Sequence, residues 1–370
     1  MRVKNGSIKK YAELLVQYCL NLKEGEKILI QSSTLAEDLV SAVYKECLKI
    51  GAYPEIQFEF KGKEEAFSKF SNENTIQHIP LLTKVAFEQF DACLFIRAPF
   101  DQGKKIKKTH LEKLRREAME PHWENYFRRT GTGELKRCLC QYPTLSGAKD
   151  AGMSINEFQK FVLHACKLNE KDPIQAWKKL GENQKELVEF LNSKTSYRFK
   201  NKKSDISFST KERIWINSDG KSNMPSGEVF TSPVENSVEG EIYFDFPFIH
   251  EGYEIKGVKL EVINGIIEKW KVQKGQKAFD RLMDIPGARI FGEAAIGTNY
   301  GIKKSIKNIL FDEKIGGTIH MAIGQSYAQA GGQNKSIIHL DLIADMTNGG
   351  LIYADNEIIY ENGKFLGFFL

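Results

Sequence analysis

The chain has 370 residues, of which 41% are hydrophobic, 11% aromatic and 27% charged. These fractions are ordinary for a globular protein and exclude a disordered or fibrous chain. The net charge of +5 comes from 53 basic and 48 acidic side chains, a mild surplus that neither implies nor excludes an acidic partner. At roughly 100 to 200 residues per domain, the length predicts two domains.

The six cysteines and the lack of long apolar runs indicate the compartment. The cysteines lie among apolar neighbours and form no CxxC pair, which predicts buried, reduced thiols. The first residues include basic side chains but no apolar run followed by a cleavage site, and no stretch of about 20 apolar residues could span a bilayer. We therefore expect a cytoplasmic protein that does not associate with membranes.

The first half alternates between strand-like and helix-like patterns. The apolar run KILIQ precedes a helix-period stretch that stops near Gly51, and EIQFEF and ACLFI follow as further strands. This order predicts a largely parallel sheet. From residue 104 to residue 194 helices are expected, with one strand around CLCQY. Two helix starts are marked by Ser154 with Glu157, a capping box, and by Asp172 before Pro173.

From about Asp205 the apolar period changes to two. Strands are expected at ISFS, RIWIN, GEVFTSP, EIYFDF, VKLEVI and IIEKWKV, the last two joined by a hairpin at Asn264-Gly265. Short helices are expected at residues 278–284 and 302–310, followed by strand-like runs at TIHMAIG, SIIHLDLIADM and LIYADNEIIY. The sequence thus predicts an α/β domain over residues 1–202 and a mainly antiparallel β domain of the α+β type over residues 203–370.

A polar pair interrupts the apolar run SIIHLDLIADM. In a strand, residues i and i+2 point to the same face, so His339 and Asp341 project together. Taken alone, such a pair is more often hydrogen-bonded at a strand end than bound to a metal.

Three further candidates lie among small residues and strand formers: His320 in TIHMAIG, Glu293 in FGEAAIG and Glu228 in PSGEVFT. Charges in such surroundings are expensive unless they are paired or bind a metal. If the five side chains converge, their nitrogen and oxygen donors suit divalent transition metals, and five ligands suit two ions that share a bridging carboxylate. The spacing in the sequence does not itself show that they meet.

Several motifs occur together, in order. They are NMPSGEVFTSPVENSVEG, FGEAAIGTN and FDEKIGGTIHMAIGQSYAQAGGQNKSIIHLDLIADM, with YPTLSGAKDAGMSINEFQKFV and SDISFSTKERIWI upstream. In these motifs the chain resembles the M29 family of metal-dependent aminopeptidases, also called thermophilic or AmpS-type aminopeptidases. The resemblance covers nearly the whole chain.

The resemblance implies metal ligands at Glu228, Glu293, His320, His339 and Asp341. It implies two divalent ions per chain, which could be zinc, cobalt, manganese or magnesium. Glu293 would bridge them, with Glu228 and Asp341 mainly on one ion and the two histidines mainly on the other. The implied activity is the release of N-terminal residues from short peptides with a free N-terminus, in a homodimer.

Two more side chains match family motifs and join Glu293 as expected catalytic residues. Tyr327, seven residues past His320, would donate a hydrogen bond to the tetrahedral intermediate, although a packed tyrosine at a strand end is an equal alternative. Glu313 in FDEK would act as a base or support a ligand, but could equally pair with Lys314. The short, glycine-rich AQAGGQN connection departs from longer members of the family, so substrate preference is not carried over.

Parts of the sequence are compatible with other functions. A two-metal centre could instead hydrolyse phosphate esters, and a non-catalytic binding protein could keep the same ligands. The stretches GTNYGIKKS and AGGQNKS lack the GxxxxGK[ST] spacing of a phosphate loop. The basic run KKIKK, residues 104–108, fits a solvated helical face, and the near-balanced charge argues against nucleic-acid binding.

Overall fold

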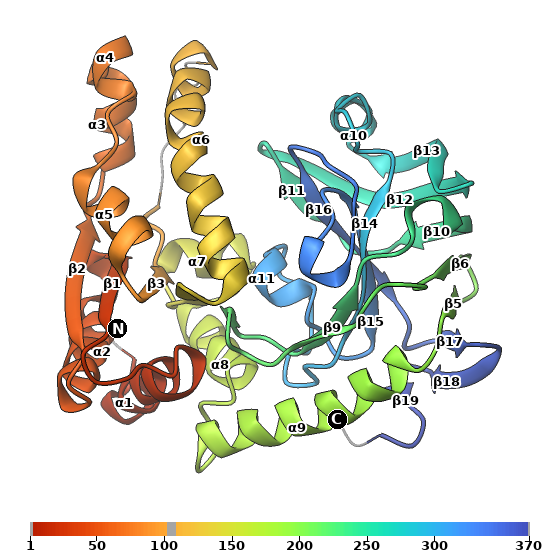
Figure 1. Cartoon of the computed structure of the whole chain (residues 1–370), viewed down its shortest axis with the longest axis horizontal. Helices are drawn as coiled ribbons and strands as arrows, with labels where there is room; N and C mark the ends of the chain where they lie inside the picture. Colours follow the sequence, from red (N-terminus) through yellow and green to blue (C-terminus); the bar gives the residue numbers. More distant parts are fainter. Residues whose placement is uncertain (1–2, 102–108, 369–370) are drawn as a thin grey trace. The chain divides into compact units, whose positions relative to one another are not determined.

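The computed structural model describes residues 3–101 and 109–368, and it divides into two compact units. One unit comprises residues 1–174 with 220–224, and the other comprises residues 175–219 with 225–370 (Figure 1). Residues 175–202, which the sequence assigned to the first domain, belong to the second unit, and the domain boundary at 202/203 stays a prediction. The run KKIKK lies outside the described residues.

The first unit contains a parallel sheet in the order β2-β1-β3-β4-β8. Its strands are β1 (Lys27–Ser33), β2 (Tyr53–Glu59), β3 (Ala92–Arg97), β4 (Lys136–Gln141) and β8 (Asn223–Met224). The predicted parallel sheet is confirmed, and β4 is the strand expected around CLCQY.

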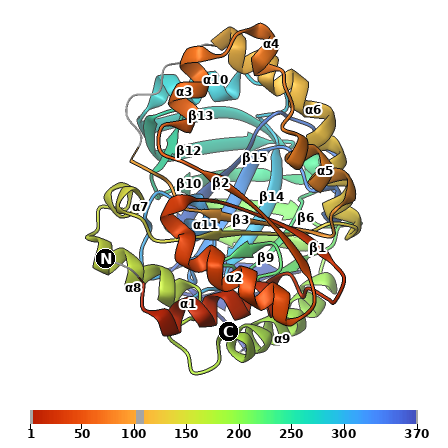
Figure 2. The same cartoon turned by 90° about the vertical axis from the view of Figure 1, so that its left-hand side faces the viewer.

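This unit also contains helices, of which α2 contacts β1 and β2 and lies in front of the sheet in Figure 2. They are α1 (Asn5–Glu13), a π-helical segment (Leu14–Cys19), a 3₁₀ turn (Thr34–Ala36), α2 (Glu37–Lys49), α3 (Lys63–Phe70), α4 (Glu73–Ile76), α5 (Leu81–Gln89), α6 (Thr109–Thr132), α7 (Leu145–Asp150) and α8 (Ile155–Ala165). The capping box is present, because Ser154 Oγ accepts a hydrogen bond from Glu157 N and the Glu157 carboxylate accepts one from Ser154 N. All six cysteines are free and buried, as predicted.

The second unit contains two antiparallel sheets. The larger has the order β11-β12-β10-β6-β5-β17-β18-β19, with β13 paired to β12, and the smaller has the order β16-β15-β14-β9-β7. The larger is built from β5 (Ser196–Lys200), β6 (Asp205–Ser209), β10 (Glu239–Phe244), β11 (Phe248–His250), β12 (Tyr253–Ile263), β13 (Ile266–Lys274), β17 (Leu351–Ala354), β18 (Glu357–Glu361) and β19 (Lys364–Phe365). The smaller is built from β7 (Ile216–Ser218), β9 (Glu228–Thr231), β14 (Phe291–Gly297), β15 (Thr318–Gly324) and β16 (His339–Asp345).

A single hydrophobic core joins the two sheets of the second unit. It contains Phe199 and Phe208 from the larger sheet and Val229, Ile296 and Met321 from the smaller one. The helical segments of this unit are α9 (Pro173–Asn192), α10 (Gln276–Met283), α11 (Ile309–Asp312) and the 3₁₀ turns Glu235–Ser237 and Ala328–Ala330. Helix α9 begins at Pro173, as predicted, and the mainly antiparallel architecture is confirmed.

The helix expected over residues 302–310 is wrong. Only Ile309–Asp312 is helical. The preceding segment is a loop, because Asp312 accepts hydrogen bonds from Ser305 Oγ at 2.7 Å and from Ile306 N at 2.9 Å, and Lys307 has φ 59. Such bonds between a side chain and the backbone compete with a helix.

The run LIYADNEIIY is a hairpin rather than one strand. Strands β17 and β18 pair across Asp355 and Asn356, whose φ values of 45 and 70 lie in the left-handed region. The expected hairpin at Asn264-Gly265 is confirmed, with φ values of 50 and 80. Within residues 3–101 and 109–368, no helix combines the length and apolar character needed to cross a membrane.

Candidate metal centre

Strand alternation brings the predicted ligands of β15 and β16 to one face of the smaller sheet. In β15, Ile319 and Met321 belong to the core, so His320 points to the opposite face. In β16, Leu342 belongs to the core, and His339 and Asp341 point away from it. Both strands therefore present their polar side chains on the face turned away from the larger sheet.

The predicted ligands of β9 and β14 reach the same face. Val229 belongs to the core, so Glu228 points away from it. In β14, Phe291 belongs to the core and simple alternation would send Glu293 inward as well, but the register shifts between these two residues. This β-bulge at Gly292 turns Glu293 to the ligand face.

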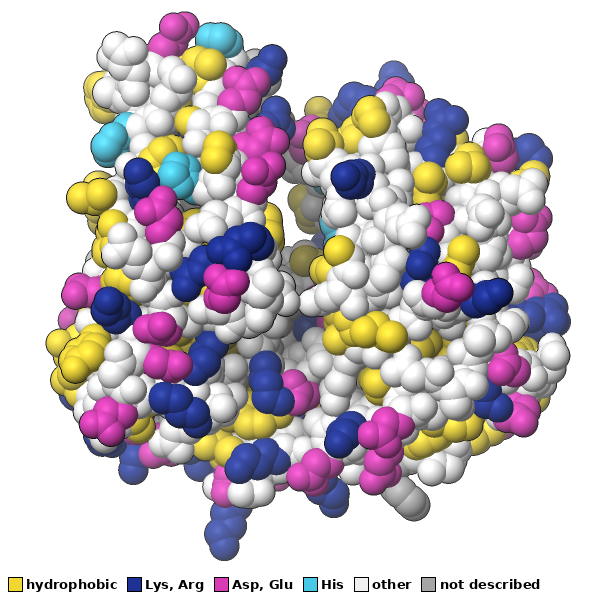
Figure 3. All heavy atoms as spheres, viewed as in Figure 1, with side chains coloured by type: hydrophobic (Ala, Val, Ile, Leu, Met, Phe, Trp, Pro, Cys, Tyr) yellow, Lys and Arg dark blue, Asp and Glu magenta, His cyan; other side chains and the backbone are white. Residues whose placement is uncertain are grey.

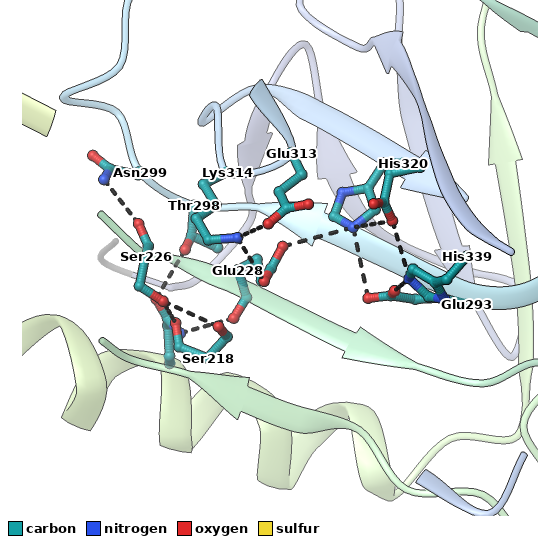
Figure 4. A network of polar contacts seen from close by, with 12 residues as sticks. Ser218, Ser226, Glu228, Glu293, Thr298, Asn299, Glu313, Lys314, His320 and His339 are labelled. Carbon is teal, nitrogen blue, oxygen red and sulfur yellow. Dashed lines mark hydrogen bonds and ion pairs between the residues drawn. The ribbon is translucent and has the colours of Figure 1, made fainter. Parts of the chain in front are cut away.

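Small side chains leave room among the ligands. Ala322 pairs with Glu293 on one side and with Asp341 on the other, and Ala295 pairs with His320. Glu228, Glu293, His320 and Asp341 are each at most 9% exposed. The structure thus brings all five predicted ligands into one largely buried cluster, in which Figure 4 labels Glu228, Glu293, His320 and His339.

Three carboxylate oxygens surround the ring of His320. His320 Nε2 lies 3.6 Å from Glu228 Oε2, 3.6 Å from Glu293 Oε1 and 3.9 Å from Asp341 Oδ1. These separations are too long for hydrogen bonds. They are close to the spacing of about 3.4 Å between donors around a tetrahedral ion with bonds of about 2.1 Å.

The other oxygen of Glu293 faces His339. His339 Nε2 lies 3.0 Å from Glu293 Oε2 and 3.4 Å from Asp341 Oδ1. His339 Nδ1 lies 2.7 Å from the carbonyl oxygen of Gln325, which can only accept, so Nδ1 donates the hydrogen. In a neutral ring, Nε2 then carries a lone pair on the same side as the carboxylate oxygens, which is the orientation of a metal-binding histidine.

The donor set fits a divalent cation. Glu228 Oε2 is buried without a hydrogen-bond partner, and one donor atom each from Glu293, His320 and Asp341 lies within 4.8 Å of the others. Acceptor atoms so close together need positive charge between them. Carboxylate and imidazole donors are those that zinc, cobalt and manganese accept.

The pKa values show how strongly the cluster attracts positive charge. Burial alone would lower the pKa of His320, but the facing carboxylates outweigh it and raise the pKa to about 9. In the same way, Asp341 and Glu293 overcome burial and raise the pKa of His339 to about 12. Burial would raise the pKa of Glu293, but the two histidines lower it, so this carboxylate stays ionised.

A buried lysine joins the cluster from the other side. Lys314 Nζ lies 3.1 Å from Glu228 Oε1 and also forms an ion pair with Glu313. Burial raises the pKa of Glu313 to about 8 even though Lys314 opposes the rise. Gln184, in α9, donates to the backbone oxygen of Glu228 at 3.0 Å.

Tyr327 lies beside the cluster. Its ring centroid is 4.9 Å from that of His339 and 5.1 Å from that of Phe230, and the residue is 37% exposed. Desolvation and the neighbouring carboxylates raise the pKa of Tyr327 well above its usual value, so the hydroxyl keeps its proton. The predicted residues therefore lie together, whereas sequence reasoning missed Lys314 and Gln184 as partners of Glu228. The adjacent Glu313 and Lys314 in FDEK were the only signal for this arrangement.

Comparisons with known proteins identify the family of the chain. Residues 4–365 match the family described as thermophilic metalloprotease (M29). Aminopeptidase AmpS of Bacillus subtilis (strain 168) is 25% identical over 424 residues, which cover 96% of this chain and 97% of that protein. Aminopeptidase 2 of Geobacillus stearothermophilus is 24% identical over 405 residues, which cover 96% of each.

A solved structure has the same fold. Wild-type AmpT from Thermus thermophilus superimposes with a TM-score of 0.82 at 21% sequence identity, covering 97% of this chain and 99% of that one. The expected architecture is thus confirmed. Because the family match spans nearly all of the sequence, the chain belongs to the M29 family of thermophilic metalloproteases, as its motifs predicted.

Proposed function

We propose that this metalloprotease is an aminopeptidase that removes N-terminal residues from short peptides with two divalent ions bound at the cluster. Membership of M29 supports metal-dependent proteolysis, and the relatives described as aminopeptidases support attack at the N-terminus. The observation that carries the proposal is the position of Glu293, whose two oxygens face two different histidines. A carboxylate so placed suits a bridge between two ions.

The distances favour one distribution of the ligands. Glu228 and His320 would hold one ion with Glu293 Oε1, and His339 would hold the other with Glu293 Oε2. Asp341 Oδ1 lies near both rings, at 3.9 and 3.4 Å, and could serve either ion. This grouping puts the two histidines on different ions, whereas the family resemblance implied that both lie mainly on one ion.

The bound ions would supply an activated water and a polarised scissile carbonyl. Glu313 would accept the proton of the attacking water, because a carboxyl with a pKa near neutrality can both take and return it. Tyr327 would donate a hydrogen bond where negative charge develops on the substrate, since its hydroxyl remains protonated. Glu293 would fix the position of His320 and Glu228 relative to that of His339, because each of its oxygens faces one of the two histidines.

Zinc, cobalt, manganese and magnesium all remain candidates, because availability can override the preferences of such donors. The homodimer, the cytoplasmic location and the absence of nucleic-acid binding also remain predictions. Light scattering would test the homodimer.

The replacement Glu293→Ala tests the proposed centre. We expect it to abolish peptide hydrolysis and to reduce the bound metal, because Glu293 is the carboxylate whose two oxygens face both histidines. Metal content and peptide cleavage are measured on the same preparation. Glu357→Ala is the matched control, because Glu357 is an exposed carboxylate paired with Lys194 in the same unit. Normal turnover by Glu293→Ala would refute the proposed role.

A further inference from the structure

Lys314 carries a charge in a place where water cannot reach it. Its side chain is 0% exposed, and its ammonium contacts the carboxylates of Glu228 and Glu313. A buried ion pair adds little to stability, because desolvation offsets the attraction and an apolar pair would often serve as well. A lysine in this position therefore calls for an explanation other than folding.

The backbone around Lys314 is packed tightly against strand β14. Asn299 N donates to the carbonyl of Lys314 at 2.9 Å, and a side chain at Gly297 would place its Cβ 2.1 Å from the carbonyl oxygen of Ile315. Gly297 is also the residue of β14 that pairs with Glu228 in β9. The glycine lets the lysine segment approach β14 at the level of Glu228.

The contact with Lys314 makes the two oxygens of Glu228 unequal. Oε1 is 3.1 Å from the ammonium. Oε2 has no hydrogen-bond partner and faces His320 Nε2 at 3.6 Å (Figure 4). The backbone of the same residue is held by Gln184, so both ends of Glu228 are fixed.

We propose that Lys314 is a positioning residue of the metal centre, which occupies one oxygen of Glu228 so that only the other oxygen can bind an ion. The proposal rests on the metal centre of the proposed function and deepens it. Such a contact fixes the direction of a ligand before the ion arrives, as partners of metal ligands do in other proteins. Lys314 also holds Glu313 next to the site, on the same ammonium.

The test compares the cobalt affinity of Lys314→Met with that of the wild-type chain. Protein freed of metal by chelation is titrated with Co²⁺ against a chromophoric chelator, and the visible absorption of the bound ion is recorded. We expect Lys314→Met to weaken one of two bound ions by about 10- to 100-fold and to change its absorption bands. Lys194→Met is the matched control, because Lys194 pairs with Glu357 outside the cluster and should leave both readouts unchanged. Wild-type affinity and absorption in Lys314→Met would overturn the proposal.

A double variant separates positioning from charge balance. Lys314→Met with Glu313→Gln removes the ammonium together with the carboxyl group that pairs with it, and we expect its Co²⁺ affinity to stay low because Glu228 is still not held. Recovery of wild-type affinity would overturn positioning in favour of simple neutralisation. If thermal unfolding shows that Lys314→Met does not fold, Lys314→Gln decides on the same criteria.

The wild-type titration distinguishes this proposal from the proposed function. A wild-type chain that binds two Co²⁺ ions but cleaves no peptide with zinc, cobalt, manganese or magnesium would refute the aminopeptidase function, and the role of Lys314 would still be decided by its Co²⁺ affinity. A wild-type chain that binds no Co²⁺ would refute both.

Discussion

Glu293, His320 and Asp341 are buried polar side chains that would be costly to keep in a protein without a cation. Each carboxylate faces a histidine, which is charged only when it is protonated, and His320 faces carboxylates. The carboxylates of the cluster outnumber the side chains around them that are always positively charged. The excess of acceptors makes a cation the natural partner of the cluster. The residue types of the cluster were predictable from the sequence, because each proposed ligand stands among small residues and strand formers.

The contact between Lys314 and Glu228 could not be predicted from the sequence around either residue. The chain has 53 basic residues, and no local pattern distinguishes the one beside Glu228 from those on the surface. Sequence reasoning paired it with Glu313, which the structure also shows, but could not foresee its contact with Glu228, 86 positions away. That contact depends on the close approach of the backbone at residues 314–315 to Gly297 of β14, which pairs with Glu228.

Replacement of Tyr327 by phenylalanine tests the proposed hydrogen bond to the reacting substrate. We expect Tyr327→Phe to lower kcat by about 100- to 1,000-fold, because one donor at a developing negative charge contributes about that much. KM and metal content should change little, since the ring contacts with His339 and Phe230 remain. Steady-state kinetics and metal analysis measure these effects.

Tyr253→Phe is a suitable control, because Tyr253 is 54% exposed and belongs to β12 of the larger sheet. A kcat of Tyr327→Phe within twofold of the wild type would favour the alternative of a tyrosine that only packs at a strand end.

At the scale of elements, the β-bulge in β14 decides whether the site can form. Glu293 and Phe291 are two positions apart and would share a face in a regular strand, but the shift at Gly292 separates them. The alternation of apolar residues predicted the strands and the common face of His339 and Asp341. It could not predict the bulge, because the bulge follows from a close approach of the backbone at residues 324–325.

Gly292→Ala tests this role of the bulge. A Cβ at this position would lie 2.4 Å from the carbonyl oxygen of Gln325, so β14 would have to shift and carry Glu293 with it. We expect weaker metal binding and a loss of about 1 to 3 kcal/mol in the free energy of unfolding. Metal titration and chemical denaturation measure the two effects.

Gly252→Ala is the control for Gly292→Ala. An added Cβ at Gly252 meets nothing within 4 Å, although φ of 83 adds some strain. This variant should therefore lose some stability and keep its metal affinity. Unchanged metal affinity in Gly292→Ala would contradict the role assigned to the bulge.

Two other segments have a different secondary structure from the one that the sequence predicted, and neighbouring side chains or turn residues explain each difference. The segment before α11 is a loop because Asp312 binds Ser305 and the backbone of Ile306, and its apolar spacing alone suggested a helix. The run LIYADNEIIY folds back at Asp355-Asn356, where two residues with positive φ form the turn. Both errors arose where side chains that favour turns lie inside apolar patterns.

At the scale of the whole molecule, the two architectures were predictable and the limits of the two units were not. Alternating strands and helices indicated the parallel sheet, and a period of two indicated the antiparallel sheets. Helix α9 belongs to the second unit although it follows a helical region of the first, and residues 220–224 return to the first sheet as β8. Long-range pairing of this kind leaves no local signal.

The surface agrees with a chain of modest net charge. On the face shown in Figure 3, basic and acidic side chains are interspersed. The expectation that the protein does not bind nucleic acid was based on the near-balanced composition, and it stays a prediction. Retention on heparin at physiological salt would test it.

The proposed function is metal-dependent cleavage at a free N-terminus. The most direct measurement is release of the N-terminal residue from a free peptide and from its N-acetylated twin, after chelation and after re-addition of zinc, cobalt, manganese or magnesium. We predict that chelation stops cleavage, that at least one metal restores it, and that only the free peptide is cut. Failure of every metal to support cleavage, or equal cleavage of the acetylated peptide, would contradict an aminopeptidase built on this cluster.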